Sequence, residues 1–422
     1  MLKNQENRIA LISVDGDPAV EIGREEAGGQ NVYVRQVGYT LAEMGWQVDM
    51  FTRRSSSKQA AIVPHHPNCR TIRLNAGPAE FIGRNDLFDY LPEFVEEFRR
   101  FQQEQGYTYP LIHTNYWLSS WIGMELKKHQ PLVQVHTYHS LGAVKYKTLG
   151  GTLPEVAIQR LAVEKACLET VNRVVATSPQ EQKHLRTLVS SQGEIEMIPC
   201  GTDIEKFGGI ERNHARQKLD IEPDAKMVFY VGRFDRRKGI ETLVRAVGRS
   251  QFRNEGKLKL VIGGGYVPGH SDGMERDRIA QIVAELGLTD ITTFTGRLDH
   301  SVLPYYYAAA DVCVVPSHYE PFGLVAIEAM ASKTPVVASA VGGLQFTVIP
   351  EVTGLLAPPK NADAFALAID RILANPEWRD QLGEAGRQRV EIAFSWYSVG
   401  VRLTQLYTQL LNPNATKSPV AA

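Results

Sequence analysis

The stretch IALISV (residues 9–14) is short and almost wholly apolar, as strands buried inside a parallel sheet are. A loop ending in Gly28-Gly29 follows, and apolar side chains then recur at helical spacing from Tyr33 to Met44 before Gly45, which suits a helix end. Residues 48–52 predict a second strand. Strand, helix and strand in this order form a βαβ unit, which implies parallel strands with helices packed on the sheet.

The same alternation runs along the whole chain in two series. A chain of 422 residues is longer than one hydrophobic core usually supports, and glycines cluster between residues 201 and 209. We therefore expect an α/β protein of two doubly wound domains, residues 1–205 and 206–394, followed by a last helix at 395–412. The remaining strand candidates are residues 111–113, 132–137, 173–177, 227–231, 258–262, 292–295, 312–316 and 335–339.

Composition indicates an ordinary globular protein. Hydrophobic residues make up 43% and charged residues 22%, and the net charge of −1 creates no general attraction to nucleic acid or acidic membranes. The four cysteines are scattered, residues 1–8 do not resemble a signal peptide, and no apolar run could cross a bilayer. We expect a cytoplasmic monomer or weak oligomer that binds small molecules, without nucleic-acid partners or integral membrane association.

Two stretches of the second half carry groups suited to a nucleotide. In GRFDRRKG (residues 232–239), Arg233 and Lys238 follow a predicted strand, and together they suit a diphosphate. In EPFGLVAIE (residues 320–328), Glu320 precedes a helix whose first N–H groups lie near Gly323, and Glu328 follows one turn later. The alternatives are a solvated basic turn for the first stretch and a structural ion pair for Glu328.

Two stretches of the first half follow strands in the same way. Gly28-Gly29 lies before the first helix, where backbone can approach an anion or merely form a flexible turn. His139-Ser140 follows the strand at residues 132–137, although a lone histidine is more often structural than catalytic. No GxGxxG fingerprint is present, which disfavours a nicotinamide enzyme.

Together the two stretches of the second half resemble the donor-site motifs of retaining glycosyltransferases of the GT-B fold, group 1 or GT4 type. The resemblance implies two Rossmann-like domains facing across a deep cleft, with the last helix returning to the N-terminal domain. It implies catalytic roles for His139, Arg233, Lys238 and Glu320. By the same resemblance the donor is bound by Gly29, Arg233, Lys238, Arg297, Glu320, Phe322, Gly323, Leu324, Val325 and Glu328.

Within that class the N-terminal half is similar to the sucrose-phosphate synthases, in GGQNVYV (residues 28–34) and in HSLG (residues 139–142) followed by Lys145. The position two residues before Arg160, where their pattern has a second arginine, is Ile158. Residues 116–119 and 143–145 look more like transferases that act on inositol phosphate. These resemblances imply acceptor binding by Gly29, Gln30, Arg84, Tyr116, Ser140, Lys145 and Arg160.

The activity implied is transfer of glucose from UDP-glucose, or ADP-glucose, to fructose 6-phosphate, with inositol phosphate or another sugar phosphate as the alternative acceptor. The nucleotide sugar is a co-substrate, so we expect no cofactor. We also expect no metal, since cationic side chains already serve the diphosphate and Asp15-Gly-Asp17 lies in an N-domain loop. Two further alternatives are a sugar-binding protein without catalysis and a nucleotide-sugar epimerase.

Overall fold

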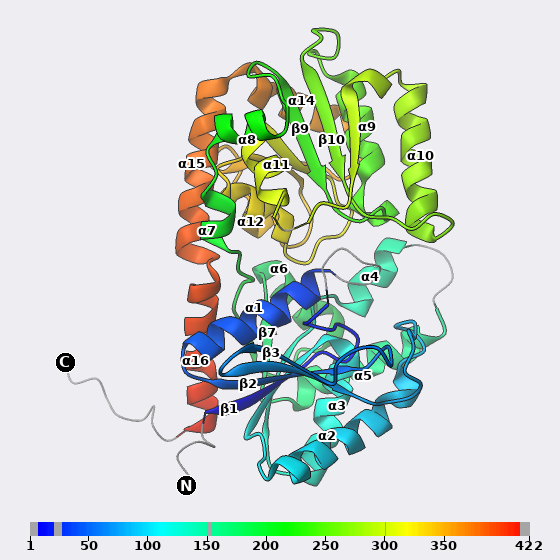
Figure 1. Cartoon of the computed structure of the whole chain (residues 1–422), viewed down its shortest axis with the longest axis vertical. Coiled ribbons are helices and arrows are strands. Elements are labelled where there is room, and N and C mark those ends of the chain that lie inside the picture. The colour runs from blue at the N-terminus through cyan, green and yellow to red at the C-terminus, as the bar shows by residue number, and fades with distance from the viewer. Residues whose placement is uncertain (1–6, 21–27, 150–153, 300, 414–422) are drawn as a thin grey trace, which may run out of the picture. The chain divides into compact units, whose positions relative to one another are not determined.

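The computed structural model describes residues 7–20, 28–149, 154–299 and 301–413. Most of residues 1–8, on which the signal-peptide expectation rests, lie outside this part. The chain divides into two compact units, one reaching Ile198 and including Trp396 onward, the other comprising Pro199–Ser395. Both units have a largely parallel sheet with helices on both faces, which confirms the expected fold class (Figure 1).

The first unit contains, among the described residues, an eight-stranded sheet in the order β3-β4-β2-β1-β5-β6-β7-β8. Only the edge pair β3–β4 is antiparallel. The strands are β1 (Arg8–Ile12), β2 (Gln47–Arg53), β3 (Ile62–His66), β4 (Cys69–Leu74), β5 (Leu111–Asn115), β6 (Val133–Thr137), β7 (Arg173–Ala176) and β8 (Ile195–Met197).

Helices α2 and α3 cover one face of this sheet, while α1 and α16 lie on the other (Figure 1). The core is aromatic: the Phe51 ring packs on Phe98, with ring centroids 4.6 Å apart. The helices are α1 (Gly29–Glu43), α2 (Leu91–Gln105), α3 (Tyr116–His129), α4 (Gly142–Leu149), α5 (Val156–Thr170), α6 (Pro179–His184) and α16 (Trp396–Leu411).

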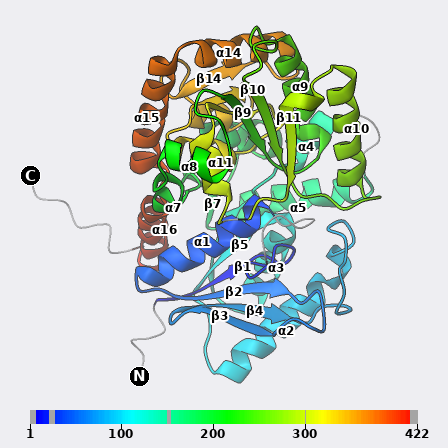
Figure 2. The same cartoon turned by 45° about the horizontal axis from the view of Figure 1, so that its top comes forward.

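The described part of the second unit contains a six-stranded parallel sheet in the order β11-β10-β9-β12-β13-β14, drawn green to orange in Figure 2. The strands are β9 (Lys226–Val231), β10 (Leu258–Gly263), β11 (Thr292–Gly296), β12 (Val312–Val315), β13 (Val336–Ser339) and β14 (Gly354–Ala357). The helices are α7 (Ile204–Gly208), α8 (Arg212–Lys218), α9 (Ile240–Arg249), α10 (Ser271–Glu285), α11 (Leu303–Ala309), α12 (Leu324–Ala331), α13 (Leu344–Thr347), α14 (Ala362–Ala374) and α15 (Pro376–Ala393).

Every strand that the sequence predicted is present, within one or two residues at its ends. The sequence did not predict the β3–β4 hairpin, β8 or β14. Strand β3 reads IVPHH and therefore has no apolar run that could be recognised. It lies at the sheet edge and is partly exposed. None of the described helices is both long enough and apolar enough to cross a membrane.

The last helix, α16, packs on the first unit, as the resemblance implied. The Tyr407 hydroxyl lies 2.6 Å from Nδ1 of His113, which is fully buried in β5. Trp46 Nε1 donates to Thr404 Oγ1, and the Trp46 and Tyr407 rings meet edge to face. Burial lowers the pKa of His113 to about 3, so this imidazole is neutral and needs polar partners inside the core.

We expect Tyr407→Phe to lower the free energy of unfolding by about 1–3 kcal/mol, because His113 Nδ1 is left buried without its partner. Tyr397→Phe is the matched control, since Tyr397 lies on the same helix and is 72% exposed. Urea denaturation of both variants measures the difference. Equal stability of the two would show that the buried hydroxyl contributes nothing.

Candidate functional site

The predicted acceptor-binding residues of the first unit lie at the carboxyl ends of its strands. Gln30 opens helix α1 after β1, Arg84 follows β4, Tyr116 follows β5, and Ser140 follows β6. Strand order reverses between β1 and β5, and ligands of open α/β sheets bind at such a switch point. The topology therefore collects residues that are far apart in the sequence at one edge.

Arg160 is the most constrained of these side chains. It is 2% exposed, and its Nε donates to Glu164 Oε1 over 2.7 Å. Its other nitrogens donate to the Tyr116 hydroxyl (3.0 Å) and to the Ser140 carbonyl oxygen (2.6 Å). Burial raises the pKa of Glu164, and the adjacent guanidinium opposes this rise.

Two arginines lie close to the Tyr116 ring. The guanidinium carbons of Arg84 and Arg160 are 5.2 and 5.0 Å from its centroid, within the range of cation–π attraction. Tyr116 has φ = 72°, which is rare for a bulky residue and costs about 1–3 kcal/mol. Strain of this kind persists where the surroundings impose it, and here it turns the chain sharply from β5 into α3.

His139 shares this edge of the sheet and also has a positive φ, 59°. Its Nε2 lies 2.9 Å from Asn115 Oδ1, and its ring packs edge-on against Tyr33. Burial lowers the pKa of His139 to about 3, so the imidazole is neutral at physiological pH. It can exchange hydrogen bonds with a sugar, but it is a poor general base.

The remaining predicted residues of this unit surround the same edge. Gly29 is the exposed first residue of α1, and Gln30 Nε2 donates to Ser13 Oγ and Asp15 Oδ1, each over 3.1 Å. Lys145 lies in α4, where its charge acts on Glu164. Asp15 and Asp17 are 2.7 Å from Arg84 Nε and 2.8 Å from Arg73 Nε, respectively.

In the second unit, two of the predicted donor-binding side chains contact each other directly. Lys238 Nζ lies 2.6 Å from Glu320 Oε2. Lys238 follows β9 and Glu320 follows β12, the neighbouring strands between which the order of this sheet reverses. Arg233 is exposed, and its carbonyl oxygen accepts hydrogen bonds from the Tyr230 hydroxyl (3.3 Å) and the Asp235 N–H (3.0 Å). Among the described residues, none forms a hydrogen bond or ion pair with its guanidinium group.

Gly239 allows the loops after β9 and β12 to pack closely against each other. This glycine has φ = 67°, and a Cβ there would lie 2.0 Å from the Pro316 carbonyl oxygen. The His318 N–H donates to the Arg237 carbonyl oxygen over 2.7 Å. The interlock fixes the stretch that carries Arg233 and Lys238 relative to the stretch that carries Glu320.

Helix α12 presents its N-terminus at this edge of the sheet. Gly323, with φ = 100°, is its N-cap, and Leu324 and Val325 are its first two residues. Their N–H groups have no partner within the helix and can bind an anion. Phe322 is buried against Phe394, which anchors the loop before the helix.

Glu328 has a partner, but a neutral one. The Tyr307 hydroxyl of α11 donates to Glu328 Oε2 over 2.8 Å, so the ion pair considered from the sequence is absent among the described residues. Burial raises the pKa of Glu328 to about 7, and the hydrogen bond from Tyr307 limits that rise. The carboxylate therefore titrates in the physiological range.

The structure thus brings some of the predicted residues into direct contact, Arg160 with Tyr116 and Ser140 in the first unit and Lys238 with Glu320 in the second. Arg297 directly follows β11, at the edge of the second sheet, and is exposed.

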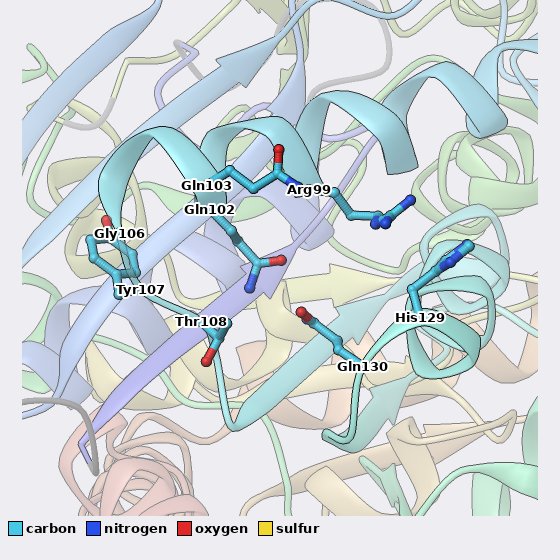
Figure 3. Close-up of a pocket in the computed structure, with 8 residues that line it drawn as sticks. All are labelled: Arg99, Gln102, Gln103, Gly106, Tyr107, Thr108, His129 and Gln130. Atoms are coloured by element: carbon cyan, nitrogen blue, oxygen red, sulfur yellow. The ribbon is translucent and has the colours of Figure 1, made fainter.

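A separate polar pocket of about 460 Å³ lies in the first unit, where α2 and α3 end, and none of the predicted residues lines it (Figure 3). Within the described residues, no three His, Cys, Asp or Glu side chains form a potential metal site.

Sequence reasoning assigned no site role to three side chains that hold these groups in place: Asp15, Glu164 and Tyr307. Asp15 was visible only as part of a motif that resembled a metal site. Glu164 lies four residues after Arg160 in a helix, a spacing typical of an ion pair, and that signal could have identified it. Tyr307 is 21 residues before Glu328, in another helix, and the sequence gives no signal for this contact.

Each unit matches a known glycosyltransferase family. The sequence profile of the family Glycosyl transferases group 1 matches residues 211–389, and that of the Glycosyl transferase 4-like domain matches residues 28–201. The chain belongs to the group 1 glycosyltransferases.

Individual relatives are similar over nearly the whole chain. Sucrose-phosphate synthase from Thermosynechococcus elongatus shares 53% sequence identity with a TM-score of 0.89, covering 97% of this chain and 100% of that one. D-inositol 3-phosphate glycosyltransferase from Kribbella flavida is 36% identical over 92% of each chain. Anabaena HepE in complex with UDP and glucose has the same fold, with a TM-score of 0.74 at 17% identity, covering 95% of this chain and 99% of HepE.

We expect Gly239→Ala to disrupt the interlock between the loops after β9 and β12, because its Cβ collides with the Pro316 carbonyl oxygen. Gly256→Ala is the control, since Gly256 has φ = 72° and open space around its Cβ position. The control should cost about 1 kcal/mol from backbone strain alone. Thermal unfolding should show a clearly larger loss for Gly239→Ala, and equal losses would mean that the loops are not locked.

Proposed function

We propose that the chain is a retaining hexosyltransferase that transfers glucose from UDP-glucose to fructose 6-phosphate, giving sucrose 6-phosphate and UDP. The observation that carries the proposal is the similarity to the sucrose-phosphate synthase of T. elongatus, at 53% identity over 97% of this chain. The arginine cluster of the first unit supports a phosphorylated acceptor, because guanidinium groups suit phosphate oxygens.

On the donor side, the diphosphate of UDP-glucose would bind Arg233, Lys238 and the N–H groups of Leu324 and Val325. Lys238 then exchanges its contact with Glu320 for phosphate oxygens, which releases Glu320 to accept hydrogen bonds from glucose hydroxyls. Glu328 accepts hydrogen bonds from both ribose hydroxyls, and the backbone near Arg297 contacts the uracil base. Gly29 and the neutral His139 face the leaving phosphate and the glucose.

On the acceptor side, the phosphate of fructose 6-phosphate binds Arg84, Lys145 and Arg160, with Tyr116 and Ser140 beside it and Gln30 at the sugar. The Arg160 guanidinium is already oriented by three hydrogen bonds, so little side-chain freedom remains to be lost on binding. Prior orientation of this kind favours a defined approach of the acceptor hydroxyl to the glucose.

In the transfer step the bond between glucose C1 and the β-phosphate oxygen breaks, and the acceptor hydroxyl oxygen bonds to C1 on the same face. The hydroxyl proton passes to a β-phosphate oxygen, so no enzyme base is required. Fixed positive charge and helix N–H groups stabilise the departing diphosphate, which is typically the largest catalytic contribution. This scheme needs no metal or cofactor.

The four buried free cysteines suit a protein of the reducing cytoplasm.

A second candidate acceptor is inositol phosphate. Relatives 36% and 35% identical to this chain, from Kribbella flavida and Saccharomonospora viridis, are D-inositol 3-phosphate glycosyltransferases. The lower identity makes this acceptor the weaker candidate, although the arginine cluster fits the phosphate of either molecule.

The test is UDP release from UDP-glucose with fructose 6-phosphate, inositol 3-phosphate or no acceptor. We expect turnover with fructose 6-phosphate, little with inositol phosphate and almost none without acceptor. ADP-glucose in parallel reactions reports the base preference. Turnover with inositol 3-phosphate alone would replace the proposed acceptor, and UDP release or donor conversion that needs no acceptor would exclude a transferase of this kind.

We also expect UDP binding to weaken as the pH falls below 7. Glu328 has a pKa of about 7, and only its ionised form accepts hydrogen bonds from both ribose hydroxyls. At pH 6 about one tenth of Glu328 is ionised, so the apparent affinity should be about tenfold lower than at pH 8.

Glu328→Gln is the control for this pH dependence, since it removes the titration and leaves only the protonation of UDP itself. Titration calorimetry at several pH values measures the difference between the two proteins. Parallel pH profiles for wild type and variant would contradict the assignment of Glu328 to the ribose.

A further inference from the structure

Two buried carboxylates support the arginines of the acceptor group, and neither was among the predicted binding residues. The Asp15 side chain is 1% exposed and the Glu164 side chain is fully buried. Both contact arginines that the proposed function assigns to the acceptor phosphate. A carboxylate repels a phosphate, so its presence beside a phosphate site requires an explanation.

Asp15 joins two elements of the acceptor group. Its Oδ2 lies 2.7 Å from Arg84 Nε, and its Oδ1 accepts a hydrogen bond from Gln30 Nε2 over 3.1 Å. Gln30 lies in the first turn of α1 and Arg84 in the loop after β4, so one fixed carboxylate sets the position of both side chains. Asp15 itself lies three residues after the end of β1, one of the two central strands of the sheet.

Glu164 supports Arg160 and Gly142 in a similar way. It accepts from Arg160 Nε over 2.7 Å, and both of its oxygens accept from the Gly142 N–H, over 3.0 and 2.9 Å. Gly142 is the first residue of α4, the helix that carries Lys145. The carboxylate therefore fixes the Arg160 guanidinium and the start of that helix together.

Each of the two carboxylates affects the binding of a phosphate in two opposing ways. Against the charges of Arg84, Lys145 and Arg160 they leave a net charge of only one positive unit, which weakens the electrostatic attraction. In return they hold long side chains in one orientation, and an ordered arginine loses less conformational freedom on binding. The burial of both carboxylates and the number of hydrogen bonds they accept favour the second effect.

We propose that Asp15 and Glu164 are positioning residues of the acceptor-phosphate site, which hold Arg84, Gln30, Arg160 and the start of α4 in the geometry that binds the phosphate. The proposal rests on the proposed function. From charge alone, removal of a carboxylate should strengthen the binding of a phosphate. The proposal predicts the opposite, namely that its removal weakens phosphate binding.

The decisive variant is Asp15→Asn, which preserves shape and an oxygen for Gln30 but removes the charge that holds Arg84. We expect the KM for the phosphorylated acceptor to rise about tenfold, with the KM for UDP-glucose changing less than twofold. Glu164→Gln should change the same KM in the same direction. Asp17→Asn is the matched control, because it removes the same charge from the same loop but faces Arg73 (2.8 Å).

A fall or no change in the acceptor KM of Asp15→Asn would overturn the proposal, since the carboxylate would then only compete with the phosphate. An equal rise in both KM values, or an equal acceptor effect in Asp17→Asn, would also overturn it, by indicating general damage to the loop. The measurement uses whichever phosphorylated acceptor the wild type turns over, so failure with fructose 6-phosphate alone affects only the proposed function. A wild type that uses only unphosphorylated acceptors overturns both.

Discussion

Parallel strands of one sheet all end along the same edge, and both groups of site residues depend on this constraint. In the first unit it brings together Gln30, Arg84, Tyr116 and Ser140, which follow four different strands. In the second it brings Lys238 beside Glu320, 82 positions later in the chain. Both sheets reverse their strand order at that point, so the loops on either side diverge and leave the strand ends open to a ligand.

In each group some of the cations are paired with carboxylates before any ligand binds. Lys238 contacts Glu320, Arg84 contacts Asp15, and Arg160 contacts Glu164. The pairs differ in burial, and the difference matters. The Lys238 and Glu320 side chains are 28% and 14% exposed, so water can replace either partner when they separate, whereas Arg160 and Glu164 are 2% and 0% exposed. Separation of the buried pair would leave a charge without solvent or partner, at a cost of several kcal/mol (~3–5). The first pair can therefore exchange partners during a reaction cycle, and the second can only hold its geometry.

The sequence predicted the elements that have a periodic apolar pattern. Strands such as β9 and β12 are continuous buried runs, and the motifs after them carry charges in a fixed order, so both could be recognised locally. Strand β3 was missed because its sequence, IVPHH, has neither an apolar run nor regular alternation. Its pairing with β4 stabilises the extended conformation that the local sequence does not indicate.

The partners of Glu328 and Arg84 were missed for a related reason. Tyr307 and Asp15 are brought to them by the packing of separate elements, and the local sequence does not encode such contacts. The positive φ of Tyr116 is likewise imposed by tertiary structure, since a tyrosine in isolation disfavours that conformation.

At Ile158 the chain departs from the arginine pattern of the sucrose-phosphate synthases, and the geometry of α5 limits what this departure means. Residues two apart on a helix point to nearly opposite sides. Arg160 points inward, 2% exposed, toward Tyr116 and Glu164, whereas Ile158 is 80% exposed. An arginine at position 158 would therefore approach an acceptor from the outer side of α5 and would not belong to the cluster around Tyr116. The cluster itself is complete without it, because every hydrogen bond that orients Arg160 comes from a residue present in this chain. Since either candidate acceptor carries a phosphate, this cluster cannot distinguish them, and discrimination must come from the residues that contact the rest of the acceptor.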